Sequence, residues 1–218
     1  SDKGKKVIFD AEHFYDGYKA NKEYAMKTVK AAEQAGAISV VLCDTNGGML
    51  SNEIAEITKE VSNNISIEIG IHSHNDMGMA VANSVIAIQS GASQVQGTFI
   101  GIGERCGNAN LSSIIPILKL KLGCDVLGNK ELLDLTKTSR AISEICNITL
   151  DDQSPFVGNS AFAHKGGMHI DAVTKAPKSY EHIDPATVGN KRRFLVSEVS
   201  GKSTILQEIK KVFPNVSK

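Results

Sequence analysis

The stretch Ile69-Gly70-Ile71-His72-Ser73-His74-Asn75-Asp76-Met77-Gly78 decides the fold, because a strand pattern in it stops abruptly at polar residues. Isoleucine recurs at every second position from 65 to 71, which is the period of a β-strand, and a polar turn containing glycine follows. Side chains alternate between the faces of a strand, so His72 and His74 share one face, with Cα atoms about 6.5 to 7 Å apart. Two imidazoles at that distance can bind one cation. We therefore expect a metal site at this strand end rather than two histidines with ordinary structural hydrogen bonds.

The chain on both sides repeats this alternation of strand and helix. Apolar runs and helical spacing predict strands at 6–10, 39–43, 65–71 and 95–102, and helices at about 21–36, 51–61, 80–90 and 111–122. Asn21 is expected to cap the first of these helices, and Gly36 to end it. Consecutive units of about 30 residues each predict parallel strands joined by right-handed crossovers.

Polar residues with useful chemistry follow the carboxyl ends of these strands. A (β/α)8 TIM barrel keeps its active site at that end and needs about 250 residues. The first strand begins almost at residue 1, so we predict that residues 1–123 form the C-terminal half of such a barrel. A doubly wound open sheet is the alternative. Its dinucleotide fingerprint is G-x-G-x-x-G, and here Gly101-x-Gly103 is followed by Cys106 where the third glycine belongs, which argues against nucleotide binding.

The character of the sequence changes after Gly123. Apolar residues between 132 and 145 predict one or two helices, 154–160 is expected to be a loop, and 161–171 is a polar, glycine-rich stretch that contains His164 and His169. A strand at 194–199 and a helix at about 203–212 are predicted to follow. We interpret residues 124–218 as a small α+β linker subdomain. On pattern alone, its two histidines could equally cap helices or bond backbone carbonyls.

Composition excludes several classes of protein. The chain has 218 residues, of which 41% are hydrophobic, and its 24 lysines and arginines balance 24 aspartates and glutamates. No net field therefore attracts nucleic acid or an anionic membrane. Four scattered cysteines with no C-x-x-C pair, and no secretory segment at the start, favour a reduced cytoplasmic protein without a disulfide framework. No apolar run approaches the roughly 20 residues that span a bilayer.

Three motifs together resemble the Claisen-type acyltransferases that include 2-isopropylmalate synthase, homocitrate synthase and citramalate synthase. The resemblance covers essentially the whole chain. The motifs are His72-Ser73-His74-Asn75-Asp76, Gly103-Glu104-Arg105-Cys106-Gly107-Asn108 and Ala163-His164-Lys165-Gly166-Gly167-Met168-His169. The segments at 10–18 and 180–185 look most like the citramalate synthase branch, with 2-isopropylmalate synthase next.

The resemblance implies a divalent metal held by His72, His74 and Asn108, with an aspartate from an earlier strand that lies outside this chain. Zinc, manganese and magnesium all suit nitrogen and oxygen ligands, so the ligand set does not choose among them. The metal would polarise the ketone of a bound 2-oxo acid. By the same resemblance Thr45 would bind the carboxylate of that acid, and Glu12 would line the pocket for acetyl-CoA and the 2-oxo acid.

Two further catalytic residues are implied by the resemblance. Glu104 would orient groups near the metal, and His169 would transfer a proton by reaching into the barrel of a partner subunit in a homodimer. A histidine with a pKa near its ordinary value of about 6.5 suits proton transfer. The structural alternatives are that Glu104 pairs with Arg105 and that Thr45 caps its turn.

The implied reaction condenses acetyl-CoA with a 2-oxo acid, best pyruvate to give citramalate, in isoleucine or leucine biosynthesis. A regulatory domain would follow Lys218, and the 218-residue chain alone would be inactive. A 2-isopropylmalate synthase acting on 2-oxoisovalerate is the first alternative. Acyl-CoA lyases of the same barrel resemble the chain at the His-x-His strand, but their last loop typically carries a Gly-Gly-Cys-Pro run, which residues 103–108 do not. A half barrel that serves only as a binding module is the non-enzymatic alternative.

Overall fold

The computed structural model describes residues 4–195, 209 and 213 of the chain. The chain divides into two compact units, Ser1–Cys124 and Asp125–Lys218, and each is described by itself. The helix expected at about 203–212 lies outside the described residues except for residue 209. The strand expected at 194–199 lies outside them beyond residue 195.

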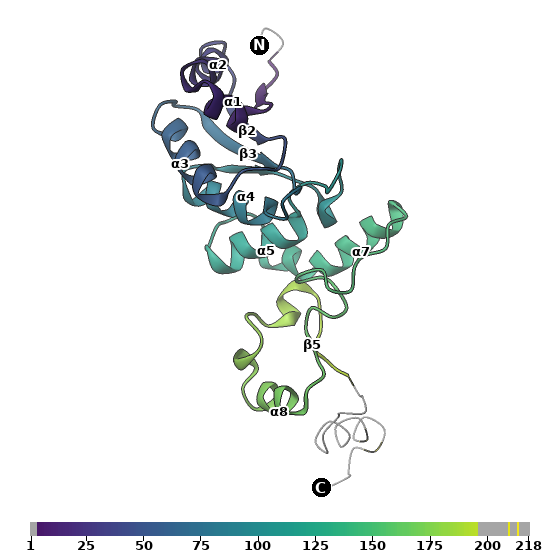
Figure 1. Cartoon of the computed structure of the whole chain (residues 1–218). Helices are drawn as coiled ribbons and strands as arrows, with labels where there is room; N and C mark the ends of the chain where they lie inside the picture. Colours follow the sequence, from purple (N-terminus) through teal and green to yellow (C-terminus); the bar gives the residue numbers. More distant parts are fainter. Residues whose placement is uncertain (1–3, 196–208, 210–212, 214–218) are drawn as a thin grey trace. The chain divides into compact units, whose positions relative to one another are not determined.

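The first unit is built on a four-stranded parallel sheet (Figure 1). Its strands are β1 (Ile8–Ala11), β2 (Ser39–Asp44), β3 (Glu68–Ser73) and β4 (Gln94–Gln96), in the order β1-β2-β3-β4. Each strand pairs in parallel with the next one along the chain. The predicted succession of parallel strand-helix units is therefore confirmed.

Three strands differ from their predicted bounds by two residues or more. The strand expected from residue 6 starts at Ile8. The strand expected from residue 65 starts at Glu68, because the amide of Ile65 bonds the Val61 carbonyl and completes the preceding helix. The strand expected at 95–102 ends at Gln96. Beyond it the Thr98 amide bonds the Ala109 carbonyl, and Phe99–Gly101 form a 3-10 turn, η1.

Helices alternate with these strands as predicted. They are α2 (Lys22–Gln34), α3 (Ser51–Ser62), α4 (Ala80–Gln89) and α5 (Leu111–Lys121). The side chain of Asn21 caps α2 by accepting a hydrogen bond of 3.0 Å from the Tyr24 amide. One more helix, α1 (Phe14–Ala20), was not predicted, because seven residues are too few for a clear apolar period. It is held by burial of Phe14 and Tyr15.

The two faces of the sheet carry different side chains. Alternate residues of β2 and β3, including Leu42 and Ile71, are fully buried in a core shared with the helices. Cys43 and His72 are the next residues along, so their side chains leave the opposite face. Burial of both faces is typical of parallel sheets. The register thus places the chemically useful side chains on the face away from the helical core.

The second unit holds short elements (Figure 1). They are α6 (Asn129–Leu133), α7 (Leu135–Ile145), β5 (Ala163–His164), α8 (Gly167–Lys175), η2 (Pro177–Ser179), η3 (Pro185–Val188) and β6 (Arg193–Phe194). The helical structure predicted between 132 and 145, expected as one or two helices, is confirmed as α6 and α7, and so is the loop at 154–160. The glycine-rich stretch at 161–171 contains β5 and the first half of α8, and β5 pairs in parallel with β6.

A buried carboxylate ties this unit together. Glu181, only 4% exposed, accepts two hydrogen bonds from Arg192, of 2.6 and 2.5 Å, and its Oε1 lies 3.2 Å from His164 Nε2. The guanidinium of Arg192 is the main cause that lowers the pKa of Glu181 below its ordinary range. The paired charges join the segment after η2 to the strand pair.

Candidate active site

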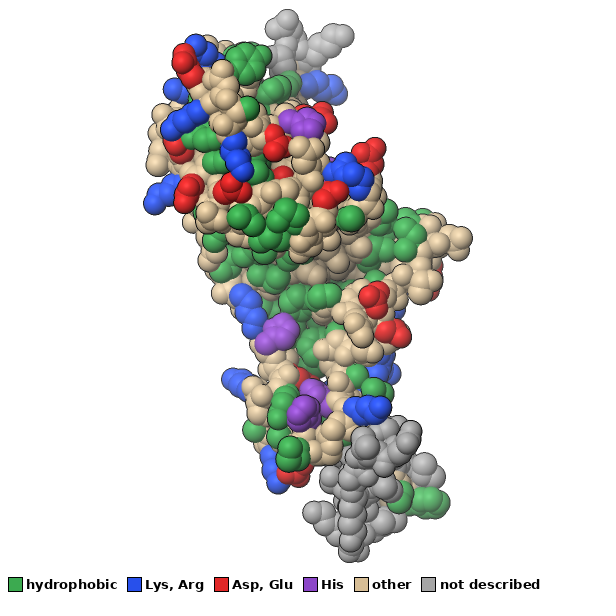
Figure 2. Space-filling model, viewed as in Figure 1, with side chains coloured by type: hydrophobic (Ala, Val, Ile, Leu, Met, Phe, Trp, Pro, Cys, Tyr) green, Lys and Arg blue, Asp and Glu red, His purple; other side chains and the backbone are tan. Residues whose placement is uncertain are grey.

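A cavity of about 220 Å³ lies where β1, β2 and β3 end. Its lining consists of Asp10, Glu12, Cys43, Thr45, His72 and His74. The structure therefore brings together four residues that the sequence analysis singled out for a site. On the face drawn in Figure 2, acidic and basic side chains are mixed over this unit, in keeping with the balanced charge of the chain.

His72 has an oxygen atom opposite each ring nitrogen. Its Nδ1 lies 2.9 Å from Gln96 Oε1, and its Nε2 lies 3.1 Å from Asn108 Oδ1. The Asn108 amide is oriented, because its Nδ2 donates to the Ile102 carbonyl at 2.9 Å. A neutral imidazole carries only one N–H, so one of these two contacts brings two lone pairs face to face. A cation between them would turn that repulsion into ligation.

His74 is prepared to bind as a neutral base. Burial is the main cause that lowers its pKa, and electrostatic interaction with His72 and with the Arg105 guanidinium lowers it further. Its Nδ1 is buried without a hydrogen-bond partner among the described residues. Such an atom costs about 1–3 kcal/mol. The ring centroids of His72 and His74 are 5.2 Å apart, so both imidazoles can reach one ion.

Asn108 arrives from the loop after β4, which folds back onto the loop after β3. His74 and Asn108 form an antiparallel bridge, and the Asn75 amide bonds the Gly107 carbonyl at 2.9 Å. Gly107 has φ +87°, and a Cβ there would overlap the Gly101 carbonyl. Among the described residues no group of three His, Cys, Asp or Glu side chains could hold a metal, and Asn108 is the third of the ligands that the sequence analysis predicted within this chain. Two nitrogens and an oxygen fit a divalent cation.

Thr45 presents a hydroxyl to the cavity. Its Oγ1 accepts a hydrogen bond of 2.8 Å from the His13 amide, which leaves the hydroxyl proton free to donate. The buried carboxylate of Asp44, which the sequence analysis did not single out, anchors the turn that follows by accepting from the Gly48 and Met49 amides. Burial raises the pKa of Asp44. The sequence signal for this role was the position of Asp44 directly before Thr45 and shortly before Gly47 and Gly48.

Arg105 is a second residue whose role was missed. Its guanidinium donates to both carboxylate oxygens of Asp76, at 2.8 and 3.1 Å, and to the Thr45 carbonyl at 2.7 Å. It thus joins the loops after β2, β3 and β4. Glu104 Oε2 lies 3.8 Å from Arg105 Nη1. The Glu104 side chain is 85% exposed and does not line the cavity. The structure does not bring Glu104 to the candidate site, and its catalytic role stays a prediction.

His169 belongs to the second unit and is exposed on α8. Its ring packs against that of Tyr180, with centroids 4.4 Å apart and planes at 30°. Tyr180 directly precedes the buried Glu181, so the ion pairs of Glu181 hold the segment that supports His169. The predicted role of His169 in a partner's site stays a prediction.

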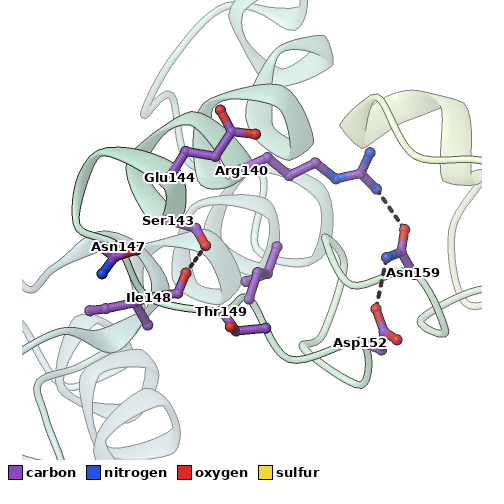
Figure 3. A pocket seen from close by; sticks show the side chains of 9 residues that line it. Arg140, Ser143, Glu144, Asn147, Ile148, Thr149, Asp152 and Asn159 are labelled. Carbon is purple, nitrogen blue, oxygen red and sulfur yellow. Dashed lines mark hydrogen bonds between the residues drawn. The ribbon is translucent and has the colours of Figure 1, made fainter.

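A larger cavity, about 570 Å³, lies in the second unit at the end of α7 (Figure 3). Arg140 reaches across it to Asn159 at 3.1 Å, and Asn159 in turn donates to Asp152 at 2.7 Å. None of the predicted site residues lines it. The two buried side-chain atoms without a partner in the described part of the chain, Ser73 Oγ and His74 Nδ1, are both in the first unit. The candidate site is therefore the smaller cavity at the strand ends.

Parallel strands with helical crossovers, and potential metal ligands at their carboxyl ends, define the class: a β/α-barrel protein of which the first unit forms part. Residues 1–145 match the HMGL-like family, and residues 156–217 match a domain described as "Homocitrate synthase post-HMGL domain-like". The chain belongs to the HMGL-like family.

Named relatives narrow the comparison. A Synechocystis (R)-citramalate synthase is 54% identical over 94% of this chain and 39% of its own length. A Methanopyrus kandleri protein named "Probable 2-isopropylmalate synthase" is 36% identical over 97% of this chain and 42% of its own length. The chain thus spans about 40% of the length of these two curated relatives.

A solved structure shows the same fold. The Bacillus subtilis HMG-CoA lyase superimposes with a TM-score of 0.52 at 24% identity, over 59% of this chain and 44% of that one. The predicted fold class, the C-terminal half of a TIM barrel followed by a smaller unit, is confirmed. No helix in the described part of the chain is both long and apolar enough to cross a bilayer.

Proposed function

We propose that this chain is part of an acyltransferase that condenses acetyl-CoA with pyruvate to give citramalate. The observation that carries the proposal is the convergence of His72, His74 and Asn108 beside Thr45 and Glu12. The higher identity to a protein named citramalate synthase than to one named 2-isopropylmalate synthase supports pyruvate over 2-oxoisovalerate. The product would enter branched-chain amino-acid synthesis in the cytoplasm.

A divalent metal held by His72, His74 and Asn108 would supply the Lewis acid that polarises the ketone of the 2-oxo acid. The Thr45 hydroxyl, which accepts a hydrogen bond from the His13 amide, donates a hydrogen bond to the substrate carboxylate. The carboxylate of Glu12 lines the same cavity and accepts a hydrogen bond from a reacting group there. These contacts fix the orientation of the 2-oxo acid, which lowers the entropic cost of reaction.

The acetyl methyl group must lose a proton before it can attack the ketone. His169 is the proposed base, acting in the site of a partner subunit of a homodimer. Its imidazole is exposed and packs on Tyr180, which restrains the ring while leaving it accessible. A group of this kind contributes about 10²–10⁴-fold to a rate.

The test is an assay of the full-length protein with acetyl-CoA and a panel of 2-oxo acids, following release of the free CoA thiol. A clear preference for pyruvate is expected. A preference for 2-oxoisovalerate would move the assignment to 2-isopropylmalate synthesis. Cleavage of a 3-hydroxyacyl-CoA to acetyl-CoA and a carbonyl compound, with no CoA thiol released from acetyl-CoA and any 2-oxo acid, would identify a lyase instead.

A further inference from the structure

Gln96 connects two residues of the candidate site that lie far apart in the sequence. It is the register partner of His72 on the neighbouring strand. Its Oε1 lies 2.9 Å from His72 Nδ1, and its Nε2 donates to Asp10 Oδ1 at 3.0 Å. Asp10 is on β1, at the other edge of the sheet. The chain of contacts therefore crosses the whole cavity face.

The hydrogen bond to Asp10 determines which way the Gln96 amide points. A carboxylate oxygen only accepts hydrogen bonds, so the NH₂ group of Gln96 must face Asp10. Its carbonyl oxygen must then face His72. That oxygen can only accept, and so the proton of a neutral His72 must be on Nδ1.

The consequence appears on the other side of the ring. With the proton on Nδ1, the lone pair of His72 is on Nε2, beside the oriented oxygen of Asn108 at 3.1 Å. The opposite tautomer would satisfy Asn108 with an N–H and would leave no lone pair there for a cation. The tautomer of His72 therefore determines whether Nε2 donates a hydrogen bond to Asn108 or keeps a lone pair that can bind a cation.

We propose that Gln96, oriented by Asp10, is a positioning residue that fixes His72 in its Nδ1–H tautomer and presents Nε2 to a divalent cation. The proposal rests on the metal site of the proposed function. Partners that orient metal-binding histidines in this way typically change metal affinity by about 10–100-fold when they are removed. Neither Gln96 nor its amide needs to touch the substrate for this effect.

The first measurement needs no metal and no activity. In the metal-free full-length protein at pH 8, nitrogen NMR of the histidine rings reports which nitrogen carries the proton. His72 is expected to be protonated on Nδ1. In Gln96→Leu the proton should move to Nε2, where Asn108 Oδ1 can accept it. An unchanged tautomer in this variant would overturn the proposal.

The second measurement is titration of the same proteins with Mn²⁺ alone. Gln96→Leu should weaken binding about 10–100-fold. The double variant Gln96→Glu, Asp10→Asn should recover most of that loss, because the new amide donates to the new carboxylate, whose other oxygen still accepts from Nδ1–H. Failure of the double variant to bind better than Gln96→Leu would contradict the mechanism.

A matched control lies two residues away on the same strand. Gln94 Oε1 accepts from Ser39 Oγ at 3.2 Å and does not contact His72. Gln94→Leu should keep wild-type Mn²⁺ affinity and the His72 tautomer, and an equal loss there would show a general effect of strand damage and overturn the proposal. Wild-type affinity in His72→Ala would refute the metal site itself, whereas failure of the pyruvate assay with the tautomer result intact would refute only the reaction.

Discussion

At the scale of single residues, the site is defined by polar atoms that lack a suitable hydrogen-bond partner. Nδ1 of His74 is buried without a partner among the described residues, and His72 Nε2 faces an oxygen. In the full-length protein, His72→Ala and His74→Ala should each lower metal content and turnover sharply, because each removes a nitrogen ligand that no nearby group replaces. Metal content after dialysis, measured by elemental analysis, checks this.

His13→Asn is the control for both variants. Its imidazole is exposed and lies beside Asp16, and asparagine tolerates the left-handed backbone found at this position. This variant should retain its metal. Wild-type metal content in both His72→Ala and His74→Ala would refute the assignment.

At the scale of elements, three loops are held in one arrangement by Arg105. Its bonds reach Asp76 and the Thr45 carbonyl, and its own loop carries Asn108. Arg105→Met should raise the KM for the 2-oxo acid several-fold, because Thr45 loses its support. The free energy of unfolding should change little, since the Arg105–Asp76 pair is partly exposed and solvent screens it.

Kinetics and urea unfolding of the same full-length variant separate these two effects. Lys59→Met, a change at an exposed lysine of α3, serves as the control and should leave KM unaltered. A KM equal to that of the wild type in Arg105→Met would show that the loops keep their arrangement without the guanidinium.

The second unit offers a pH-dependent test at the same scale. Arg192→Met leaves Glu181 buried and without its main partner, which should cost about 3 kcal/mol. The native pKa of Glu181 lies below its ordinary value of 4.5, so the pair stabilises the fold fully above that pH and less as pH falls through the native pKa. The difference between wild type and variant should therefore be largest near pH 7 and shrink as the pH falls toward and below about 4.5, because Glu181 of the variant can then bury itself as the neutral acid.

Hydrogen exchange at the amides of Arg193 and Leu195 reports this stability, because both donate across the β5–β6 strand pair. Lys178→Met, at an exposed position nearby, should change exchange little. A difference that does not depend on pH would contradict the role of the ionised Glu181.

At the scale of the whole molecule, β1 is an open edge. Among the described residues it pairs only with β2, and Val7, Ile8 and Phe9 are 46%, 44% and 37% exposed. Unpaired apolar edges promote pairing between chains. The 218-residue chain should therefore self-associate, which light scattering can measure. We also expect this chain to lack synthase activity, which an assay of CoA release can measure. Phe9→Lys should lower the mass measured by light scattering toward that of the monomer. Tyr24→Lys, at an exposed position of α2, should not change that mass. A monomeric wild-type chain would contradict the prediction.

Subunit exchange tests the proposed homodimer. Full-length His169→Ala should bind metal normally but lose turnover, because only the base is removed. Mixing it with His74→Ala should restore part of the activity, since one site of a hybrid dimer then holds both an intact metal site and an intact His169. Absence of rescue after proven exchange would place the whole site in one chain.

Local sequence pattern was sufficient for much of this molecule. The periods of β2, α2, α3, α4 and α5, the cap at Asn21 and the pairing of His72 with His74 on one strand face depend on residues near in sequence. Side-chain period and backbone capping act over a few residues, and so they can be read without the fold. The family resemblance supplied Asn108, Thr45 and Glu12.

Only the tertiary structure decided what surrounds these residues. The Gln96–Asp10 bond joins residues 86 apart in sequence, and the Arg105 bonds join residues 29 and 60 apart. The strand β4 ends early because the Thr98 amide donates its hydrogen bond to the Ala109 carbonyl and not to a neighbouring strand. Such contacts are set by strand order and loop closure, which bring distant polar groups together after the core has formed. Sequence therefore determined the potential ligands, and the fold determined their orientation.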